Sequence, residues 1–241
     1  MWRSEIPRCI YARLYAGWRR VRREVDIIDS ILRRAGARRV IEFGCGLGRH
    51  GYLLSRRGYE VVLSDIADQR FGIARKLPFV RYDLLAGGSI GSFDAGYAVG
   101  VITLFEYRDI ARILRNIWDN IAEDGIFIFD YNFTSYRDPE KVEIRVNGRR
   151  YTAILEKGVY KPHNGGLVYE YIVRVIDEKG RVVGVEEASY PIYPRDKIFR
   201  AIEEAGYSIH EIVWVSWDPI EYIYKPASED ADSAFIAIKK I

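Results

Sequence analysis

The segment Val40-Ile-Glu-Phe-Gly-Cys-Gly-Leu-Gly-Arg-His50 constrains the fold of this chain more than any other. An apolar run reaches the acidic residue Glu42, and the alternating glycines Gly44, Gly46 and Gly48 follow it. Glycine tolerates positive φ and lets the backbone approach a bulky ligand closely. A buried strand that enters such a loop and then a helix is a nucleotide-binding unit of open α/β sheets. The segment therefore predicts a strand, a glycine-rich loop and a helix at one edge of a parallel sheet.

Two nucleotide ligands are compatible with this loop. Gly46-Leu-Gly48-Arg-His-Gly51 fits G-x-G-x-x-G, the dinucleotide pattern, in which helix N–H groups hold a pyrophosphate. In that pattern the apolar strand runs straight into the first glycine, whereas here Glu42, Gly44 and Cys45 intervene. A carboxylate at the loop entrance favours positive charge, such as the sulfonium and α-amino groups of S-adenosylmethionine. The loop thus favours S-adenosylmethionine over NAD, and a glycine-rich turn without a ligand is the third alternative.

Two more predicted strands end in acids. Residues 59–65 end in Asp65, which can accept hydrogen bonds from both ribose hydroxyls. Residues 79–84 contain Asp83, which can accept from an adenine amino group. Each acid alone could be a helix N-cap. The ordered set of an acid, a glycine loop and two further strand-end acids is much harder to obtain by chance.

With these motifs the chain resembles the class I S-adenosylmethionine-dependent methyltransferases, in the branch that acts on small molecules. Glu42–Gly48 is similar to their first motif, Ser64-Asp65-Ile66 to their ribose motif and Tyr82-Asp83-Leu84 to their adenine motif. Residues 93–130 are similar to their fourth strand, the next helix and their fifth strand. The resemblance extends over nearly the whole chain. The fourth strand lacks an Asn/Asp-Pro-Pro-Tyr motif, which argues against adenine in DNA as the methyl acceptor.

The resemblance implies an α/β fold, with an open, seven-stranded, mostly parallel, doubly wound sheet and an inserted small antiparallel β-sheet. It implies S-adenosyl-L-methionine as cofactor, S-adenosyl-L-homocysteine as product, no metal, and transfer of a methyl group to an N or O atom of a small molecule. The residues expected at the cofactor are Tyr11, Tyr15, Trp18, Glu42, Gly44, Cys45, Gly46, Gly48, Asp65, Ile66, Asp83, Leu84, Val99 and Gly100.

The N-terminal region predicts one helix over residues 8–35. Its apolar stripe has steps of three and four residues: Ile10, Leu14, Trp18, Val21, Val25, Ile28 and Leu32. Four arginines lie off this stripe and are expected to face water: Arg19, Arg20, Arg22 and Arg23. In related small-molecule methyltransferases a Tyr-rich N-terminal segment closes over the cofactor, and Tyr11, Tyr15 and Trp18 match it. The alternative is that these aromatic residues only anchor the helix to the core.

After the fifth strand the pattern changes to hairpins. Asn147-Gly148 separates two alternating runs and favours a type I′ turn, and a second hairpin turns at Lys179-Gly180. We therefore expect a core formed by residues 1–135 and 191–241, and a β-rich insert, residues 136–190, over the acceptor site. A dimer interface formed by the insert is the alternative. A general base is needed only for a protonated acceptor, and the candidates are Tyr131, Tyr136, His163, Tyr190 and Tyr193.

Charge leaves a second function open. The first 60 residues hold 14 arginines and six acids, a net charge of +8, and this region could meet phosphate. An RNA (tRNA) methyltransferase is therefore an alternative, and so is a protein that binds S-adenosylmethionine without transferring its methyl group. A solvated helix face is the simpler explanation of the charge, and we favour it.

Composition predicts a cytoplasmic protein without membrane contact, either a monomer or a homodimer. No apolar run reaches about 18 residues, and residues 1–8 lack the apolar region of a signal peptide. The cysteines, Cys9 and Cys45, form no disulfide framework, and no zinc spacing occurs. Gln69 is the only glutamine, and this scarcity of thermolabile amides predicts a thermophilic source.

Overall fold

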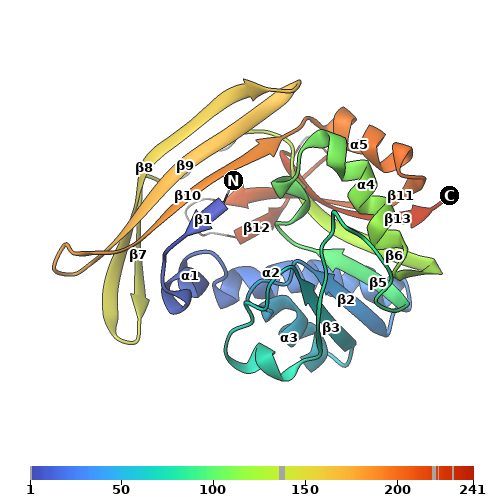
Figure 1. The fold of residues 1–241 in the computed structure, drawn as a ribbon, viewed down its shortest axis with the longest axis horizontal. Helices are drawn as coiled ribbons and strands as arrows, with labels where there is room; N and C mark the ends of the chain where they lie inside the picture. The colour runs from blue at the N-terminus through green and yellow to red at the C-terminus, as the bar shows by residue number, and fades with distance from the viewer. Residues whose placement is uncertain (1, 136–138, 219–220, 222, 230) are drawn as a thin grey trace.

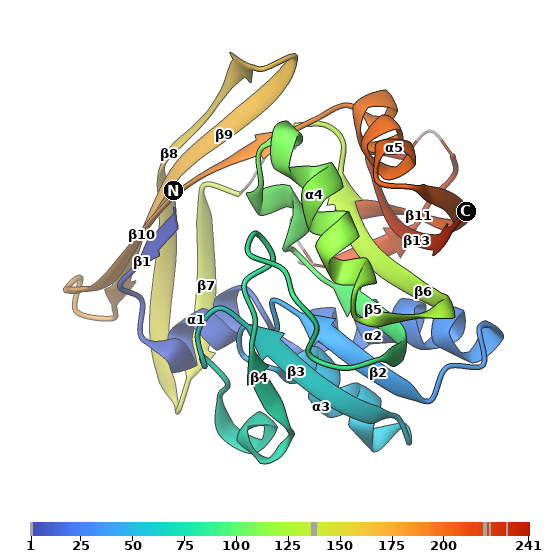
Figure 2. The same cartoon turned by 45° about the vertical axis from the view of Figure 1, so that its right-hand side comes forward.

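The computed structural model describes residues 2–135, 139–218, 221, 223–229 and 231–241, and these form two β-sheets with helices around the larger one (Figures 1 and 2). The larger sheet has eight strands and the smaller has five. In both views the smaller sheet arches away from the larger one on the side of the N-terminus.

The eight-stranded sheet has the order β12-β11-β13-β6-β5-β2-β3-β4. Its parallel part, in chain order, is β2 (Arg39–Phe43), β3 (Glu60–Asp65), β4 (Phe79–Arg81), β5 (Phe93–Ala98) and β6 (Ile121–Asn132). Three antiparallel strands complete it: β11 (Tyr207–Asp218), β12 (Ile223–Pro226) and β13 (Ser233–Lys240). The predicted open, mostly parallel α/β sheet is confirmed, and β12 adds an eighth strand to the seven that the sequence indicated.

Helices cover both faces of this sheet, as expected of a doubly wound fold. On one face α2 (Trp18–Arg34) and α3 (Arg49–Arg56) pack in a buried cluster that includes Val25, Ile28 and Leu63. On the other face α4 (Tyr107–Trp118) and α5 (Arg195–Glu204) pack with Phe127 and Phe129. Two short 3-10 helices, η1 (Gly72–Lys76) and η2 (Ile102–Leu104), lie in the loops that follow β3 and β5.

The N-terminal region is two helices, so the prediction of one helix over residues 8–35 was wrong. The first helix, α1 (Arg8–Leu14), ends before Gly17, whose extended backbone (φ −57°, ψ 141°) precedes α2. The apolar stripe divides at this break. Ile10 and Leu14 are buried against the smaller sheet, whereas Val21 and Val25 are buried against the larger one. A straight helix could not serve two packing surfaces, so the chain breaks between them.

The smaller sheet is antiparallel and has the order β1-β10-β9-β8-β7. Its strands are β1 (Trp2–Ser4), β7 (Lys141–Val146), β8 (Arg149–His163), β9 (Gly166–Asp177) and β10 (Val182–Ile192). Asn147 and Gly148 both have positive φ, as the predicted type I′ turn requires. The sequence analysis missed that Asn164-Gly165 makes the same kind of turn and that β1 pairs with β10.

Among the described residues, no helix combines the length and the hydropathy of a transmembrane span.

Gly51 marks the closest approach of α3 to the sheet. A Cβ on this residue would lie 2.9 Å from Glu42 Oε2 and 3.1 Å from Val61 Cγ1, with Leu63 closer still. We predict that Gly51→Ala destabilises the protein by about 1–2 kcal/mol, because overpacking outweighs the better helix propensity of alanine. Urea unfolding measures this change. Arg56→Ala, at an exposed position of the same helix, is the control, because it adds no atom to the packed interface. Equal losses in the two variants would contradict the prediction.

Candidate active site

The glycine loop lies at the carboxyl end of β2. Gly44, Gly46 and Gly48 all have positive φ. A Cβ on Gly44 would lie 2.5 Å from Val101, and one on Gly48 would lie 2.9 Å from Ala74, whereas one on Gly46 would meet nothing within 4 Å. Other side chains thus occupy the space beside Gly44 and Gly48, whereas the space beside Gly46 is free. A ligand that lies on the loop requires such a free face.

Two of the predicted site acids lie at neighbouring strand ends beside this loop. Asp65, half-buried at the end of β3, accepts hydrogen bonds from the backbone of Gly46 (2.8 Å) and Ala67 (3.3 Å). Asp83 follows β4, is exposed, and accepts from the backbone of Leu85 at 2.9 Å. Carboxyl ends of parallel strands are where open α/β sheets bind ligands. The structure therefore brings Asp65 and Asp83 to the expected edge, and Asp65 also holds the glycine loop in place.

Glu42 points beneath the loop. Its side chain is buried, and Oε2 accepts hydrogen bonds from the Gly51 amide (3.0 Å) and the Tyr97 hydroxyl (3.1 Å). Burial raises the pKa of Glu42 to about 7. This carboxylate therefore has a structural task, since it joins β2 to α3 and β5, in addition to the ligand role that the sequence suggested.

A chain of buried charges continues from Glu42 into α2. Glu24, which is 1% exposed, accepts from Arg20 Nε (2.7 Å) and pairs with His50 Nε2 (2.7 Å). His50 Nδ1 lies 3.6 Å from Glu42 Oε1. Burial acts to raise the pKa of Glu24, but Arg20 and His50 outweigh it and hold that pKa below its usual value. Burial acts to lower the pKa of His50, but the carboxylates outweigh it and raise that pKa.

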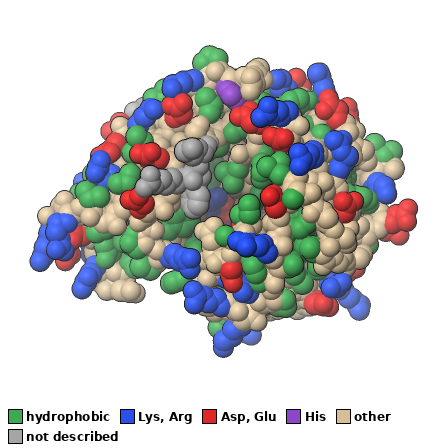
Figure 3. All heavy atoms as spheres, in the orientation of Figure 1, with side chains coloured by type: hydrophobic (Ala, Val, Ile, Leu, Met, Phe, Trp, Pro, Cys, Tyr) green, Lys and Arg blue, Asp and Glu red, His purple; other side chains and the backbone are tan. Residues whose placement is uncertain are grey.

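Two adjacent cavities, an inner and an outer one, lie between the larger sheet and the strands of the smaller sheet. Each has a volume of about 130 Å³, and both are lined by Arg20, Tyr190 and Trp217. The inner cavity reaches the carboxyl ends of β5 and β6, and its remaining lining is Gly100, Thr103, Asp130, Asn132, Ile192, Tyr224 and Ser233. The outer cavity reaches Tyr15 of the N-terminal segment and Tyr171 of β9. In Figure 3 hydrophobic side chains are visible on the smaller sheet and on the core beside it, and charged side chains of both signs are spread over the same face.

Asp130 is the buried acid of the inner cavity. It lies near the end of β6 and is 5% exposed. Its Oδ1 accepts from the Gly100 amide at 2.6 Å, and its Oδ2 accepts from the Tyr224 hydroxyl at 3.3 Å. Burial raises the pKa of Asp130 to about 6. The sequence analysis did not name Asp130 as a site residue, although a strand-end acid is the signal that identified Asp65 and Asp83.

The fold that carries this site is matched by known structures. The chain has the fold of the S-adenosylmethionine-dependent small-molecule methyltransferases. A methyltransferase from Clostridium acetobutylicum superimposes with a TM-score of 0.71, at 14% identity over 96% of both chains. A sugar N-methyltransferase from Streptoalloteichus gives 0.70, at 16% identity over 96% of this chain and 93% of the other. An amino pentose methyltransferase from Micromonospora echinaspora, solved with S-adenosylmethionine bound, gives 0.71, at 16% identity over 96% and 97%.

Sequence comparison reaches less far than the fold. No family model matches the chain. A Geobacillus sp. (strain WCH70) protein named as a methyltransferase is 24% identical over 115 residues, which are 44% of this chain and 47% of that protein. The chain thus matches about half the length of this curated relative.

The aromatic residues of the N-terminal segment that we expect to close over the cofactor lie in two places. Tyr11 and Tyr15, with ring centroids 4.9 Å apart, pack in the cluster between α1 and the smaller sheet. Trp18 packs against α3, where it meets Tyr52 and the guanidinium of Arg49. Arg49 also donates to the carbonyls of Ala12 (2.8 Å) and Ala16. The helix after the glycine loop is therefore tied to the N-terminal segment through Arg49 and Trp18.

Arg20 does not face water, so that prediction was wrong. Its guanidinium lies 4.9 Å from the centroid of the Trp217 ring, and Nη1 donates to the Tyr15 carbonyl at 3.1 Å. The physical reason is Glu24, a buried carboxylate one turn later that requires a positive partner. The spacing of Arg20 and Glu24, i and i+4, was the available signal.

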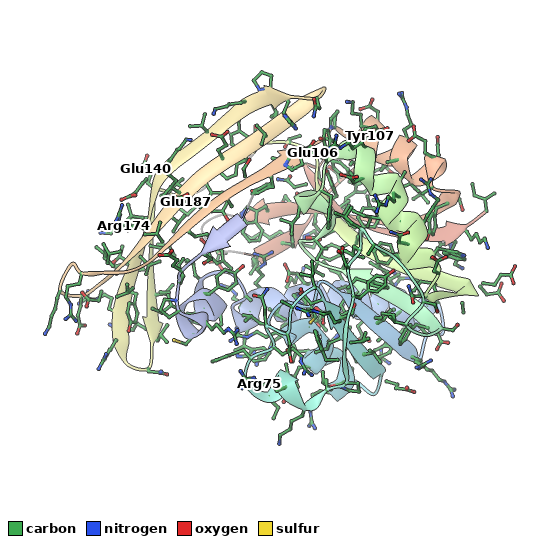
Figure 4. All side chains as sticks on the ribbon, viewed as in Figure 1. Arg75, Glu106, Tyr107, Glu140, Arg174 and Glu187 are labelled. Carbon is green, nitrogen blue, oxygen red and sulfur yellow. The ribbon has the colours of Figure 1, made fainter. Side chains whose placement is uncertain are left out.

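The residues predicted as candidate general bases lie in different parts of the structure. His163 and Tyr193 both bind Glu106, at 2.9 and 2.8 Å, where the tip of the β8–β9 hairpin reaches the start of α4. Figure 4 shows Glu106 and Tyr107 together at this junction, and it shows Glu140, Arg174 and Glu187 along the smaller sheet. Tyr131 is buried, and its hydroxyl accepts from the Tyr193 amide. Tyr190 lines both cavities, and Tyr136 lies outside the described residues.

The remaining predicted residues surround the glycine loop and its neighbouring strand ends. Cys45 and Leu84 are buried, Val99 is half-buried, Gly100 is exposed, and Ile66 is 59% exposed. Many arginines of the basic N-terminal region bind acids: Arg19, Arg20, Arg33, Arg34, Arg39 and Arg57 each form an ion pair. Within the part of the chain that the structure describes, no group of three or more His, Cys, Asp or Glu side chains could hold a metal ion.

The buried charge chain should carry much of the stability of the α2–α3 pair. We predict that Glu24→Gln lowers the free energy of unfolding by about 3–5 kcal/mol, because it leaves the buried Arg20 and His50 side chains without their carboxylate partner. Urea unfolding at neutral pH measures the loss.

A matched exposed pair provides the control. Glu60, whose side chain is 70% exposed, binds Arg39 at 3.1 Å, and Glu60→Gln should cost at most about 1 kcal/mol.

The pKa of Glu24 is lower in the folded protein than its usual 4.5. Its stabilisation is therefore present above that pH and is lost as the pH falls through the folded value. A loss in Glu24→Gln that matches Glu60→Gln would contradict the role of the buried chain.

Proposed function

We propose that this protein is an S-adenosylmethionine-dependent methyltransferase that methylates a nitrogen or oxygen atom of a small molecule. The observation that carries the proposal is that the open glycine loop, Asp65 and Asp83 share one sheet edge with the inner cavity. The fold of the known small-molecule methyltransferases supports it.

The residues beside the glycine loop suit this cofactor. When bound, S-adenosylmethionine supplies a methyl group on a positively charged sulfur. The open face at Gly46 would accept the methionine part, Asp65 the ribose hydroxyls, and Asp83 with Leu84 the adenine. Gly44, Cys45 and Gly48 would shape the loop beneath, Ile66 and Val99 would line its sides, and Gly100 would lie between the cofactor and the inner cavity. Trp18 and the N-terminal segment with Tyr11 and Tyr15 would close the site, since Arg49 already ties that segment to α3.

Residues 136–190 would select the acceptor. Tyr171 of the smaller sheet lines the outer cavity, and Tyr190 at the end of this segment lines both cavities. Holding an acceptor in line with the methyl group can supply roughly 7–11 kcal/mol of the barrier. The structural neighbours named as sugar N- and amino pentose methyltransferases favour nitrogen over oxygen. Residence in the cytoplasm, a thermophilic source and the choice between monomer and homodimer stay predictions from composition.

A substitution of Asp65 tests the proposed cofactor-binding site. We predict that Asp65→Asn weakens S-adenosylhomocysteine binding at least about tenfold, because each hydrogen bond to an ionised carboxylate is worth roughly 1.5–3 kcal/mol. Isothermal titration calorimetry measures the affinity. Asp119→Asn, an exposed acid at the end of α4, should bind as the wild type does. Unchanged affinity in Asp65→Asn, or tighter binding of NAD than of S-adenosylhomocysteine by the wild type, would count against the assignment.

The reaction itself is tested with methyl-labelled S-adenosylmethionine and a cell extract, fractionated into small molecules, RNA and protein. We expect label in the small-molecule fraction, and loss of that label with Asp65→Asn. Label in RNA would support the alternative of a tRNA methyltransferase, and no transfer at all would support a binding protein.

A further inference from the structure

We propose that Asp130 anchors an amine acceptor and takes the proton that its nitrogen loses, so that the acceptor class is a primary or secondary amine. This inference rests on the proposed methyl transfer, and it adds a catalytic residue and a substrate class to it.

The first support is the place of Asp130. Its carboxylate lines the inner cavity at the carboxyl end of β6, next to Gly100 at the end of β5. The Gly100 amide and the Tyr224 hydroxyl each donate one hydrogen bond to it, on different oxygens. An ionised carboxyl group has about four acceptor sites. Asp130 is thus oriented by two neighbours and can still accept N–H donors from the cavity.

The second support is the rest of the cavity lining. The cavity walls include the aromatic residues Tyr190, Trp217 and Tyr224, which suit a cationic group. The polar side chains Thr103, Asn132 and Ser233 line the same cavity, and Ser233 donates to Asn132 at 3.1 Å. At about 130 Å³ the inner cavity holds only the reacting end of an acceptor, and the outer cavity, which shares three lining residues with it, would hold the rest.

The third support is the charge balance behind the cavity. Three carboxyl groups, on Glu24, Glu42 and Asp130, lie together with two basic side chains, Arg20 and His50. Arg20 and Glu24 come from α2, His50 from α3 and Tyr224 from β12, and all four influence Asp130 or contact it. Arg20 and His50 both pair with Glu24, so an ammonium group in the cavity would be the direct positive partner of Asp130.

The proposed step conserves atoms and electrons. The Asp130 carboxylate accepts one N–H proton from the ammonium group, which frees the nitrogen lone pair. That lone pair forms the new N–CH₃ bond, and the electron pair of the broken S–CH₃ bond stays on sulfur. The proton ends on Asp130 and leaves with the product or through the cavity.

Binding of small amines tests the inference without turnover. Ethanolamine, benzylamine and tyramine are compared by calorimetry with ethylene glycol, benzyl alcohol and tyrosol, in the presence of S-adenosylhomocysteine. We expect at least one amine to bind the wild type more tightly than its alcohol. Asp130→Asn should weaken that amine at least about tenfold, because it removes the charged partner of a buried hydrogen bond, and should leave the alcohol unchanged.

Asp94→Asn is the matched control. Asp94 lies on β5 of the same sheet and accepts two backbone N–H bonds, from Arg38 and Arg39, both at 2.8 Å, at the opposite edge. This variant should bind amines as the wild type does.

The pH dependence separates a proton-accepting role from a structural one. Only the carboxylate form of Asp130 holds an ammonium group, so amine affinity in the wild type should fall as the pH falls through about 6. Asp130→Asn should abolish this fall. Tyr224→Phe should move its midpoint to higher pH, because the lost hydroxyl stabilises the carboxylate, and this variant carries the test if Asp130→Asn does not fold.

Three outcomes overturn the inference: no amine binds better than its alcohol, the preference survives in Asp130→Asn, or the midpoint is unchanged in Tyr224→Phe. Failure of the wild type to bind S-adenosylhomocysteine counts instead against the proposed function. With an amine that is methylated, Asp130→Asn should reduce kcat by about 10²–10⁴-fold, the usual contribution of a general base, while S-adenosylhomocysteine affinity is kept.

Discussion

The buried carboxylate of Glu24 is the constraint on which the arrangement of the site depends. A buried charge must be paired, so Arg20 turns inward from α2 and His50 turns inward from α3. His50 then approaches Glu42, which holds β2, β5 and the start of α3 together. One acid on the first core helix thereby sets the position of the helix that follows the glycine loop, and it places Arg20 in the wall of both cavities.

The N-terminal segment and the smaller sheet pack together as one unit. Strand β1 pairs with β10, and α1 packs with Ile144, Ala153 and Val175 of the smaller sheet. Arg49 ties the end of α1 back to the glycine-loop helix. Any movement that opens the acceptor cavities would therefore also move the segment proposed to close over the cofactor, because the same short helix lies between them.

Four strands of the large sheet carry an acid toward their carboxyl ends, and burial separates their properties. Asp83 is exposed and Asp65 is half-buried, so both can meet polar groups of a ligand beside water. Glu42 and Asp130 are buried, and burial raises their pKa values to about 7 and about 6. An acid at the same kind of position is thus an exposed hydrogen-bond acceptor, a buried structural partner or a buried group with a raised pKa, according to its surroundings.

Local patterns were sufficient for the α/β sheet, the glycine loop, Asp65, Asp83 and the Asn147-Gly148 hairpin, because strand periodicity and turn chemistry involve neighbours in sequence. They were insufficient for the break at Gly17, the pairing of β1 with β10, the inward turn of Arg20 and the cavity at Asp130. Each of these depends on a surface supplied by a distant segment: the smaller sheet divides the first helix, Trp217 covers the guanidinium of Arg20, and Tyr224 and Trp217 close the cavity. Contacts between segments that are distant in the sequence leave no period in it, so only the tertiary structure decides them.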